Sequence, residues 1–231
     1  MPSLNTLVKN TLLSAGVPPH RLPRRKPNII DMYTIDAELC HEYDHLAKHT
    51  LVDRNRIAFL KQFAIAVRAL AGDVAEVGVY KGGTAWLIAK NLEGTNKTLH
   101  IFDTFEGMPE THPEKDLHKK GDFADAPLDF VKRFLADRKN IMIYPGYFPD
   151  TAPPIENKEF CLVHIDVDIY QSVLDCCAFF YSRMVKCGLM VFDDYGFLST
   201  PGAKEAVDKF FADRPETPIY LLTGQALVIK S

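Results

Sequence analysis

Two short apolar stretches of the chain end in pairs of acids, a pattern that could bind a metal ion. Asp166 and Asp168 follow apolar residues in "VHIDVDIY", and Asp193 and Asp194 follow them in "GLMVFDDYG". Buried carboxylates are costly unless they are paired or bound to a cation. Because these groups offer only oxygen, they suit Mg²⁺ or another hard divalent ion.

Two residues beside Asp166 have an alternative interpretation that involves no chemistry. Asp168 precedes "YQSVLDCC", and an aspartate in that place is also typical of a helix N-cap. His164 lies two residues before Asp166. We interpret it as a core histidine or as support for a ligand, since zinc sites usually gather several histidines or cysteines.

A glycine-containing turn, "EVGVYKGGT", has the features of a nucleotide cradle. Gly78 permits a tight turn, and Gly82 and Gly83 would let a ligand approach the backbone at a helix N-terminus. Tyr80 and Thr84 lie in the same segment and belong to the predicted cofactor site. The spacing is not the G-x-G-x-x-G of dinucleotide-binding enzymes. A plain strand-to-helix turn is the alternative.

Two further acids at predicted strand ends bear on the identity of the cofactor. Glu76 would repel a pyrophosphate, but it could accept hydrogen bonds from the amino group of S-adenosylmethionine (SAM) or balance its sulfonium charge. Asp103 ends "LHIFD", where an acid can bind both ribose hydroxyls of NAD or of SAM. Glu76 and the glycine spacing therefore favour SAM over a nicotinamide cofactor.

The elements that must position these residues alternate along the chain. Apolar spacing predicts a helix over about residues 53–70, and further helices after the glycine turn and over 126–137, 171–186 and 201–212. The predicted strands are "DVAEVGVY", "TLHIFD", "NIMIYPG", "FCLVHID" and residues 188–193, 218–222 and 226–230.

This order predicts an α/β fold with a mostly parallel seven-stranded sheet, helices on both faces and a C-terminal antiparallel hairpin. Ligands of such sheets bind at the carboxyl ends of the strands, where the acids lie. We expect residues 1–52 to form an N-terminal arm or helical segment, for acceptor or oligomer contacts, and residues 53–231 to form the catalytic domain. The basic segment "HRLPRRKPN" is interpreted as a solvated arm rather than an anion site.

Composition excludes several classes of protein. The net charge of −3 offers no general attraction to nucleic acid or to an anionic membrane. No apolar run reaches the length of a membrane span, and the first residues lack the pattern of a signal peptide. The 5 cysteines show no C-x-x-C spacing, which predicts reduced, buried thiols and a cytoplasmic protein.

Six segments, in the same order, resemble the macrocin O-methyltransferase family. They are "GDVAEVGVYKGGT", "IFDTFEGMPE", "GDFADAPLDFVKRFL", "HIDVDIYQSVLD", "GLMVFDDYG" and "PGAKEAVDKFF". The resemblance spans roughly residues 53–230 and implies a Rossmann-like class I fold. It also implies a SAM-dependent and Mg²⁺-dependent enzyme that methylates sugar hydroxyls of natural products. The paired strand-end acids are more distantly similar to those of catechol O-methyltransferase.

The resemblance also implies roles for individual residues. Asp166, Asp193 and Asp194 match the metal ligands, and Asp168 matches the general base. The turn with Glu76, Gly78, Gly82 and Gly83 would hold SAM, with Asp103 on its ribose and Asp122 beside the adenosine. Related enzymes often assemble, which implies a homo-oligomer. Residues 1–50 and the ending "LLTGQALVIK" depart from the antibiotic-tailoring members, which leaves the acceptor open.

Alternative functions remain at this point. A catechol or another phenol offers the same two-oxygen chelation as a vicinal diol of a sugar. A nicotinamide-dependent enzyme and a non-catalytic SAM-binding module are the alternatives outside this class. The polar segment from Gly107 to Gly121 is interpreted as a lid, whose His112 is a second candidate base or a solvated loop residue. Tyr147, Phe148 and Gln225 are candidate pocket residues.

Overall fold

The computed structural model describes residues 32–231, which fall into two compact units. The first unit ends at Ala37 and includes the short helix α2, Met32–Ile35. The second unit is Glu38–Ser231 and begins inside helix α3, Ala37–Leu46. The unit boundary therefore falls earlier than the predicted division between residues 52 and 53. The segment "HRLPRRKPN" lies outside the described residues.

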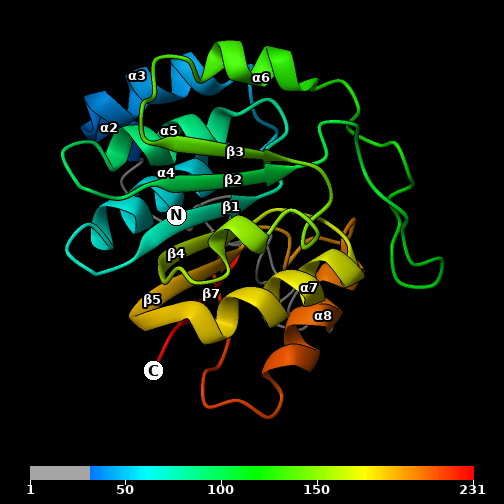
Figure 1. Ribbon diagram of the computed structural model, residues 1–231. Helices are drawn as coiled ribbons and strands as arrows, with labels where there is room; N and C mark the ends of the chain where they lie inside the picture. The colour runs from blue at the N-terminus through cyan, green and yellow to red at the C-terminus, as the bar shows by residue number, and fades with distance from the viewer. Residues whose placement is uncertain (1–31) are drawn as a thin grey trace, which may run out of the picture. The chain divides into compact units, whose positions relative to one another are not determined.

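The second unit contains one sheet of seven strands in the order β3-β2-β1-β4-β5-β7-β6 (Figure 1). Strands β1 to β5 pair in parallel, whereas β7 is antiparallel to both β5 and β6. This confirms the predicted fold class. The strands are β1 Asp73–Val77, β2 Leu99–Asp103, β3 Ile141–Pro145, β4 Phe160–Ile165, β5 Met184–Phe192, β6 Ile219–Tyr220 and β7 Ala226–Ile229.

Helices cover both faces of this sheet. Helices α4 and α5 pack together on one face, and α7 and α8 pack together on the other (Figure 1). The right-handed β-helix-β connections of parallel sheets place helices in this way. The helices are α4 Arg54–Ala66, α5 Gly83–Asn91, α6 Leu128–Phe134, α7 Tyr170–Phe180 and α8 Pro201–Phe211.

Helix α3 belongs with the sheet because its buried acid bonds to α5. Glu42 is 1% exposed and accepts hydrogen bonds from Lys90 Nζ at 2.8 Å and Asn91 Nδ2 at 3.2 Å. A buried carboxylate needs such partners. These bonds explain why the compact unit begins before the residue expected from sequence.

Three predicted helices are too long; the one expected over residues 126–137 spans only Leu128–Phe134. The helix expected over residues 171–186 ends at Phe180, and after a 3-10 turn β5 begins at Met184. Met184 is buried and pairs with Phe160 across the sheet, so strand pairing prevails over helical spacing there. The helix expected to run to residue 70 ends at Ala66.

The functional edge of the sheet follows from its strand order. β1 is central, and the chain runs outward through β2 and β3 before β4 returns to the other side of β1. The carboxyl ends of β1 and β4 therefore border the point where strand order reverses, the usual ligand site of such folds. Register pairs Val77 with Ile165, and Ile165 with Phe192, so the residues that follow these strands meet.

The cysteines match the prediction in part. Cys161, Cys176 and Cys177 are buried free thiols, whereas Cys40 is half-buried and Cys187 is exposed. Within residues 32–231, no helix is long and apolar enough to cross a membrane.

Candidate active site at the carboxyl edge of the sheet

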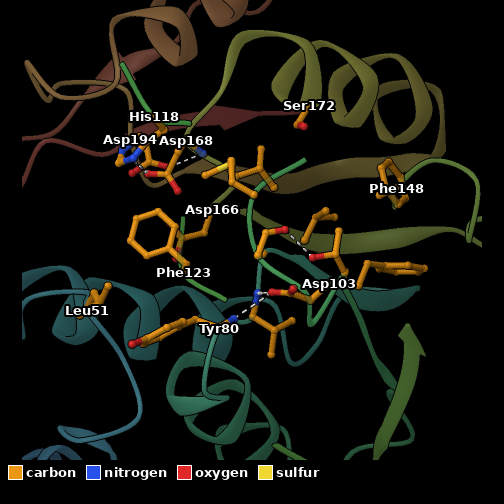
Figure 2. A pocket seen from close by; sticks show the side chains of 18 of the residues that line it. Leu51, Tyr80, Asp103, His118, Phe123, Phe148, Asp166, Asp168, Ser172 and Asp194 are labelled. Carbon is orange, nitrogen blue, oxygen red and sulfur yellow. Dashed lines mark hydrogen bonds and ion pairs between the residues drawn. The ribbon is translucent and has the colours of Figure 1, made fainter. Parts of the chain in front are cut away.

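A cavity of about 310 Å³ opens at the carboxyl ends of β1, β2 and β4. Figure 2 shows Tyr80 and Asp103 on one side of it and Asp166, Asp168 and Asp194 on the other. The predicted cofactor turn and two of the predicted metal acids, Asp166 and Asp194, thus face the same space, whereas Asp193 does not line it. That convergence of apolar walls and a few polar groups is typical of a small-molecule site.

The turn after β1 needs glycine because β4 passes close to it. Gly78 has φ +85°, and a Cβ there would lie 1.7 Å from the carbonyl oxygen of Asp166. The next two amides, of Val79 and Tyr80, donate to Asp103 Oδ2 at 2.7 and 3.0 Å. Only glycine allows the backbone of β1 to turn this tightly across the end of β4.

Asp103 holds the ends of β1 and β2 together. Its Oδ2 accepts the two amides of the β1 turn, and its Oδ1 accepts from Phe105 N at 2.8 Å. A carboxylate offers about four lone-pair positions, so one remains for a ligand hydroxyl. Asp103 lines the cavity, as does Thr84 near the start of α5.

The glycine pair at the start of α5 lies against protein rather than against the cavity. The amide of Gly83 donates to His49 O at 2.8 Å, where a Cβ would collide. A Cβ on Gly82, which has φ +91°, would meet Val131 and Phe134 of α6 at 3.3 Å. The expectation that both glycines let a ligand approach the backbone therefore does not match the structure; they let α5 pack closely.

A buried chain of charged groups runs behind the cavity. His164 Nδ1 lies 2.8 Å from Glu76 Oε1, and its Nε2 lies 3.3 Å from Asp193 Oδ1. Burial opposes charge on His164, but its bonds to Asp193 and Glu76 prevail and raise its pKa to about 10. Glu76 Oε2 has no hydrogen-bond partner among the described residues. Glu76, predicted to contact SAM, instead supports His164 and does not line the cavity.

Asp193 is fully buried and accepts from several donors. Gln225 Nε2 donates to its Oδ1 at 2.8 Å, and Arg56 Nη1 forms an ion pair with its Oδ2. Burial raises the pKa of Asp193, but His164, Arg56 and Gln225 outweigh burial and lower it. Gln225, a predicted pocket residue, thus lies behind the cavity and orients this acid.

The other three acids face the cavity. Burial raises the pKa of Asp166, of Asp168 and of Asp194, and the negative charges of neighbouring carboxylates raise it further. The amide of Asp168, which has φ +59°, donates to Asp194 Oδ2 at 3.0 Å. Acids crowded in this way gain from a bound cation, because it relieves the repulsion between them.

The donor set fits a hard divalent metal. One ligand atom from each of His164, Asp166 and Asp193 lies within 4.8 Å of the others, and Asp194 adjoins them. Both nitrogens of His164 already face carboxylates, so the oxygens are the better ligands. Asp193 retains about one lone pair after its three donors. Oxygen ligands are those that Mg²⁺ prefers.

Sequence reasoning missed Arg56, the cation of this site. It lies in the first turn of α4, with its guanidinium 4.7 Å from the ring centre of Phe197. Burial disfavours its charge, but Asp193 and Asp166 prevail and raise its pKa. A cation in the first turn opposes the helix dipole. Arg54 occupies the same turn and Arg56 Nε also donates to the N-cap Asp53 at 2.8 Å, so the sequence held no signal that singles out Arg56.

The predicted lid brings a different histidine to the cavity. His118 lines it, and its Nε2 is 3.8 Å from Asp168 Oδ1. His112, the candidate from sequence, packs its ring 6.1 Å from that of Tyr170 and does not line the cavity. Spacing alone could not distinguish the two, since both lie in the same polar segment.

The remaining predicted residues divide between cavity and surroundings. Tyr147 and Phe148 line the cavity, and Phe148 also stacks on Phe180 of the core at 5.3 Å. Asp122 does not line it; its carboxylate accepts from Lys119 N at 2.9 Å. The next residue along, Phe123, does face the cavity (Figure 2).

This combination of strand order and strand-end acids defines a class I methyltransferase fold. Residues 35–220 match the family model described as macrocin O-methyltransferase (TylF). The chain belongs to this family. The match favours the methyltransferase prediction over the nicotinamide alternative.

Relatives with known names are natural-product methyltransferases. The 8-demethyl-8-(2,3-dimethoxy-alpha-L-rhamnosyl)-tetracenomycin-C 4'-O-methyltransferase of Streptomyces olivaceus is 29% identical over 163 residues, 64% of this chain and 62% of that protein. The demethyldecarbamoylnovobiocin O-methyltransferase of Streptomyces niveus is 25% identical over 180 residues, 71% of this chain and 68% of that protein. The first match thus spans less than two thirds of the relative.

Solved structures agree on the fold. The O-methyltransferase NovP superposes with a TM-score of 0.70 at 25% identity, covering 79% of this chain and 82% of NovP. The calicheamicin methyltransferase CalS11 gives a TM-score of 0.63 at 16% identity, covering 89% of this chain and 99% of that one. The second likeness concerns the fold alone.

Proposed function

We propose that the protein is a SAM-dependent and Mg²⁺-dependent O-methyltransferase acting on a hydroxyl of a sugar or glycosylated natural product. One observation carries the proposal: the β1 turn and three crowded acids line the same cavity. The names of the relatives, which act on a rhamnosylated tetracenomycin and on a novobiocin precursor, support the acceptor class.

The cofactor half of the site is the turn after β1. Gly78, Tyr80, Thr84 and Asp103 border the cavity and would hold SAM, with the open lone pair of Asp103 on a ribose hydroxyl. The other predicted residues do not border the cavity and would support it indirectly. Glu76 orients the buried His164, Gly82 and Gly83 allow α5 to pack closely, and Asp122 holds the lid segment through its bond to Lys119 N.

The acceptor half of the site is the acid cluster. Asp166, Asp193 and Asp194 would hold the metal, whose bound ion supplies Lewis-acid activation of an acceptor hydroxyl and fixes its position. Arg56 balances only part of the negative charge here. Two neighbouring acceptor oxygens, as in a vicinal diol, would satisfy the cluster best because both can chelate one ion.

Asp168 is the proposed general base. It lines the cavity beside the metal acids, and its raised pKa makes it a better proton acceptor than an exposed aspartate. Bound SAM would supply the methyl group for the acceptor oxygen, and Asp168 would take the hydroxyl proton. Its left-handed backbone, φ +59°, turns it away from helix α7, which begins at Tyr170 without a side-chain cap.

A catechol or another phenol is the second candidate acceptor, since it offers the same pair of oxygens. Incubation with methyl-labelled SAM would separate the two, using methyl α-L-rhamnopyranoside and catechol as probes, each with Mg²⁺ and with EDTA. The proposal predicts Mg²⁺-dependent labelling of the rhamnoside. Labelling of catechol alone would establish the phenol alternative, and labelling that persists in EDTA would contradict the metal assignment.

The proposal also covers the location of the protein in the cell and its oligomeric state. Buried, unpaired thiols such as Cys161 and Cys176 are typical of proteins in a reducing compartment, which supports a cytoplasmic location. Assembly as a homo-oligomer is expected from the habit of related enzymes. Sedimentation of the full chain would test that expectation.

A further inference from the structure

Arg56 lies between the buried Asp193 and the cavity. Arg56 lines the cavity, whereas Asp193, with which it forms an ion pair, does not. The exposed fraction of the side chain is 12% for Arg56 and 0% for Asp193. The cavity therefore reaches the arginine side of this ion pair, and a metal ion that approaches Asp193 from the cavity meets the guanidinium.

The two carboxylate oxygens of Asp193 have different partners. Oδ1 accepts from Gln225 Nε2 at 2.8 Å and lies 3.3 Å from His164 Nε2, so both of its lone-pair positions are used. Among the described residues, only Arg56 bonds to Oδ2, through its Nη1. Oδ2 is thus the oxygen that Asp193 can offer to an ion, and it is also the oxygen that Arg56 holds.

Arg56 has further contacts that do not depend on Asp193. Its Nε donates to Asp53 Oδ2 at 2.8 Å, and its guanidinium lies 4.7 Å from the ring centre of Phe197. Asp53 is the N-cap of α4 and accepts from Asn55 N at 2.8 Å, so the helix itself holds this acid in place. If Arg56 releases Asp193, it therefore keeps a charged partner on one side and an aromatic ring on the other.

Charge makes the guanidinium and a divalent ion alternatives at this place. Both are cations attracted to Asp193 Oδ2, and Asp166 attracts Arg56 as well. Two positive charges a few ångströms apart repel strongly in a buried site, where the effective dielectric constant is low. An ion among the oxygens of Asp166, Asp193 and Asp194 therefore disfavours the Arg56 contact, and the Arg56 contact disfavours the ion.

We propose, building on the proposed function, that Arg56 and the metal ion are alternative partners of Asp193 Oδ2. Binding of the ion releases Arg56 from this oxygen, and the guanidinium stays with Asp53 and Phe197. Arg56 thereby compensates the charge of the buried Asp193 and lowers the affinity of the site for the ion. The affinity for the metal is then set in part by a residue that is not itself a ligand.

Calorimetric titration of Mg²⁺ measures this competition without an acceptor and without methyl transfer. Arg56→Met removes the competing cation and leaves an apolar side chain beside Phe197, so it should bind Mg²⁺ about 10-fold to 100-fold more tightly than the wild type does. Lys204→Met is the matched control, because it removes one positive charge from an exposed pair with Asp208. Its affinity for Mg²⁺ should equal that of the wild type. Equal or weaker binding by folded Arg56→Met would overturn the proposal.

A second measurement uses the wild type and does not require Arg56→Met to fold. In ¹⁵N-arginine spectra of the full chain, the Arg56 side-chain signal is assigned by its loss in Arg56→Lys. Saturation with Mg²⁺ should shift this signal and speed the exchange of its hydrogens with water, because they lose Asp193 as acceptor. Arg68, whose guanidinium donates to the carbonyls of Asn91 and Glu93, is the internal control and should not change. An Arg56 signal that saturating Mg²⁺ leaves unchanged would refute the competition.

The possible outcomes separate this proposal from the proposed function. If Mg²⁺ binds equally to the wild type and to Arg56→Met, the metal site stands and the competition with Arg56 fails. If Mg²⁺ binds to neither protein, the metal dependence of the proposed function fails, and the competition fails with it. Tighter binding by Arg56→Met, together with a shifted Arg56 signal in the wild type, supports both.

Discussion

The two edges of the sheet differ in whether their acids have partners of opposite charge. At the amino edge Asp73 begins β1 and is fully matched: its Oδ2 lies 2.8 Å from Lys158 Nζ and 3.2 Å from His100 Nε2, and its Oδ1 accepts from Thr98 N at 3.0 Å. Burial opposes ionisation, but these partners prevail and lower the pKa of Asp73.

At the carboxyl edge, burial and repulsion between acids outweigh the effect of cationic partners. Asp166, Asp168 and Asp194 crowd together, and their pKa values are raised by burial and by one another. The nearest permanent cation, Arg56, is already paired with Asp193. Matched charges stabilise a fold, whereas unmatched charges mark a place that binds or reacts. The following predictions test this difference, from the largest expected effect to the smallest.

Asp166→Asn should lower methyl transfer about 1,000-fold or more, because it removes a metal ligand from the transition state. Binding of SAM, measured by calorimetric titration, should survive, since Asp166 is not part of the β1 turn. Asp73→Asn at the opposite edge is the matched control and should leave turnover unchanged. Wild-type activity of Asp166→Asn would show that this acid of the carboxyl edge is not needed for methyl transfer.

Asp168→Asn should slow the chemical step about 100-fold to 1,000-fold while metal binding persists, because an amide cannot accept the proton. Single-turnover kinetics measures the step, and calorimetry measures Mg²⁺ binding. Unchanged single-turnover kinetics would eliminate Asp168 as the base. Loss of Mg²⁺ binding would instead make Asp168 a ligand.

Arg56→Met should destabilise the protein by about 3 kcal/mol, because it removes one of the two cationic partners of the buried Asp193 and leaves only His164. The free energy of unfolding in urea measures this effect. The control is Lys204→Met, which removes one member of an exposed pair with Asp208 and should cost about 0.5 kcal/mol or less. Equal stability of the two variants would show that the carboxyl edge does not depend on Arg56.

Asp73→Asn should change how stability depends on pH. The folded pKa of Asp73 is lowered from its ordinary 3.8, so its stabilising contribution is complete above that value. The contribution is lost as pH falls through the folded pKa. Urea unfolding should therefore show a deficit in Asp73→Asn at neutral pH that shrinks as the solution is acidified below pH 4. A deficit that grows on acidification would mean that Asp73 is not the matched acid described above.

Much of this edge could be predicted because strand patterns are local. The apolar runs before Asp103, Asp166 and Asp193 placed each acid at a strand end, and the alternation of strands and helices placed those ends together. The family resemblance then gave the acids their roles. The strand ends of a parallel sheet are one of the few places where sequence order determines which side chains meet.

The parts that could not be predicted come from segments whose path is set by tertiary packing. Arg56 reaches Asp193 from a helix far earlier in the chain, and His118 reaches Asp168 from an irregular loop. The glycine pair was misjudged because nothing local shows that His49 and α6 occupy the space beside it. In each case the deciding neighbour lies far away in sequence.

Calorimetric titration of Mg²⁺ into the wild type, Asp166→Asn and Asp73→Asn tests the central claim most directly. The account predicts one binding event per chain in the wild type and in Asp73→Asn, and none in Asp166→Asn. Absence of binding to the wild type, or equal binding to all three proteins, would contradict the assignment of the carboxyl-edge acids as a metal-dependent catalytic site.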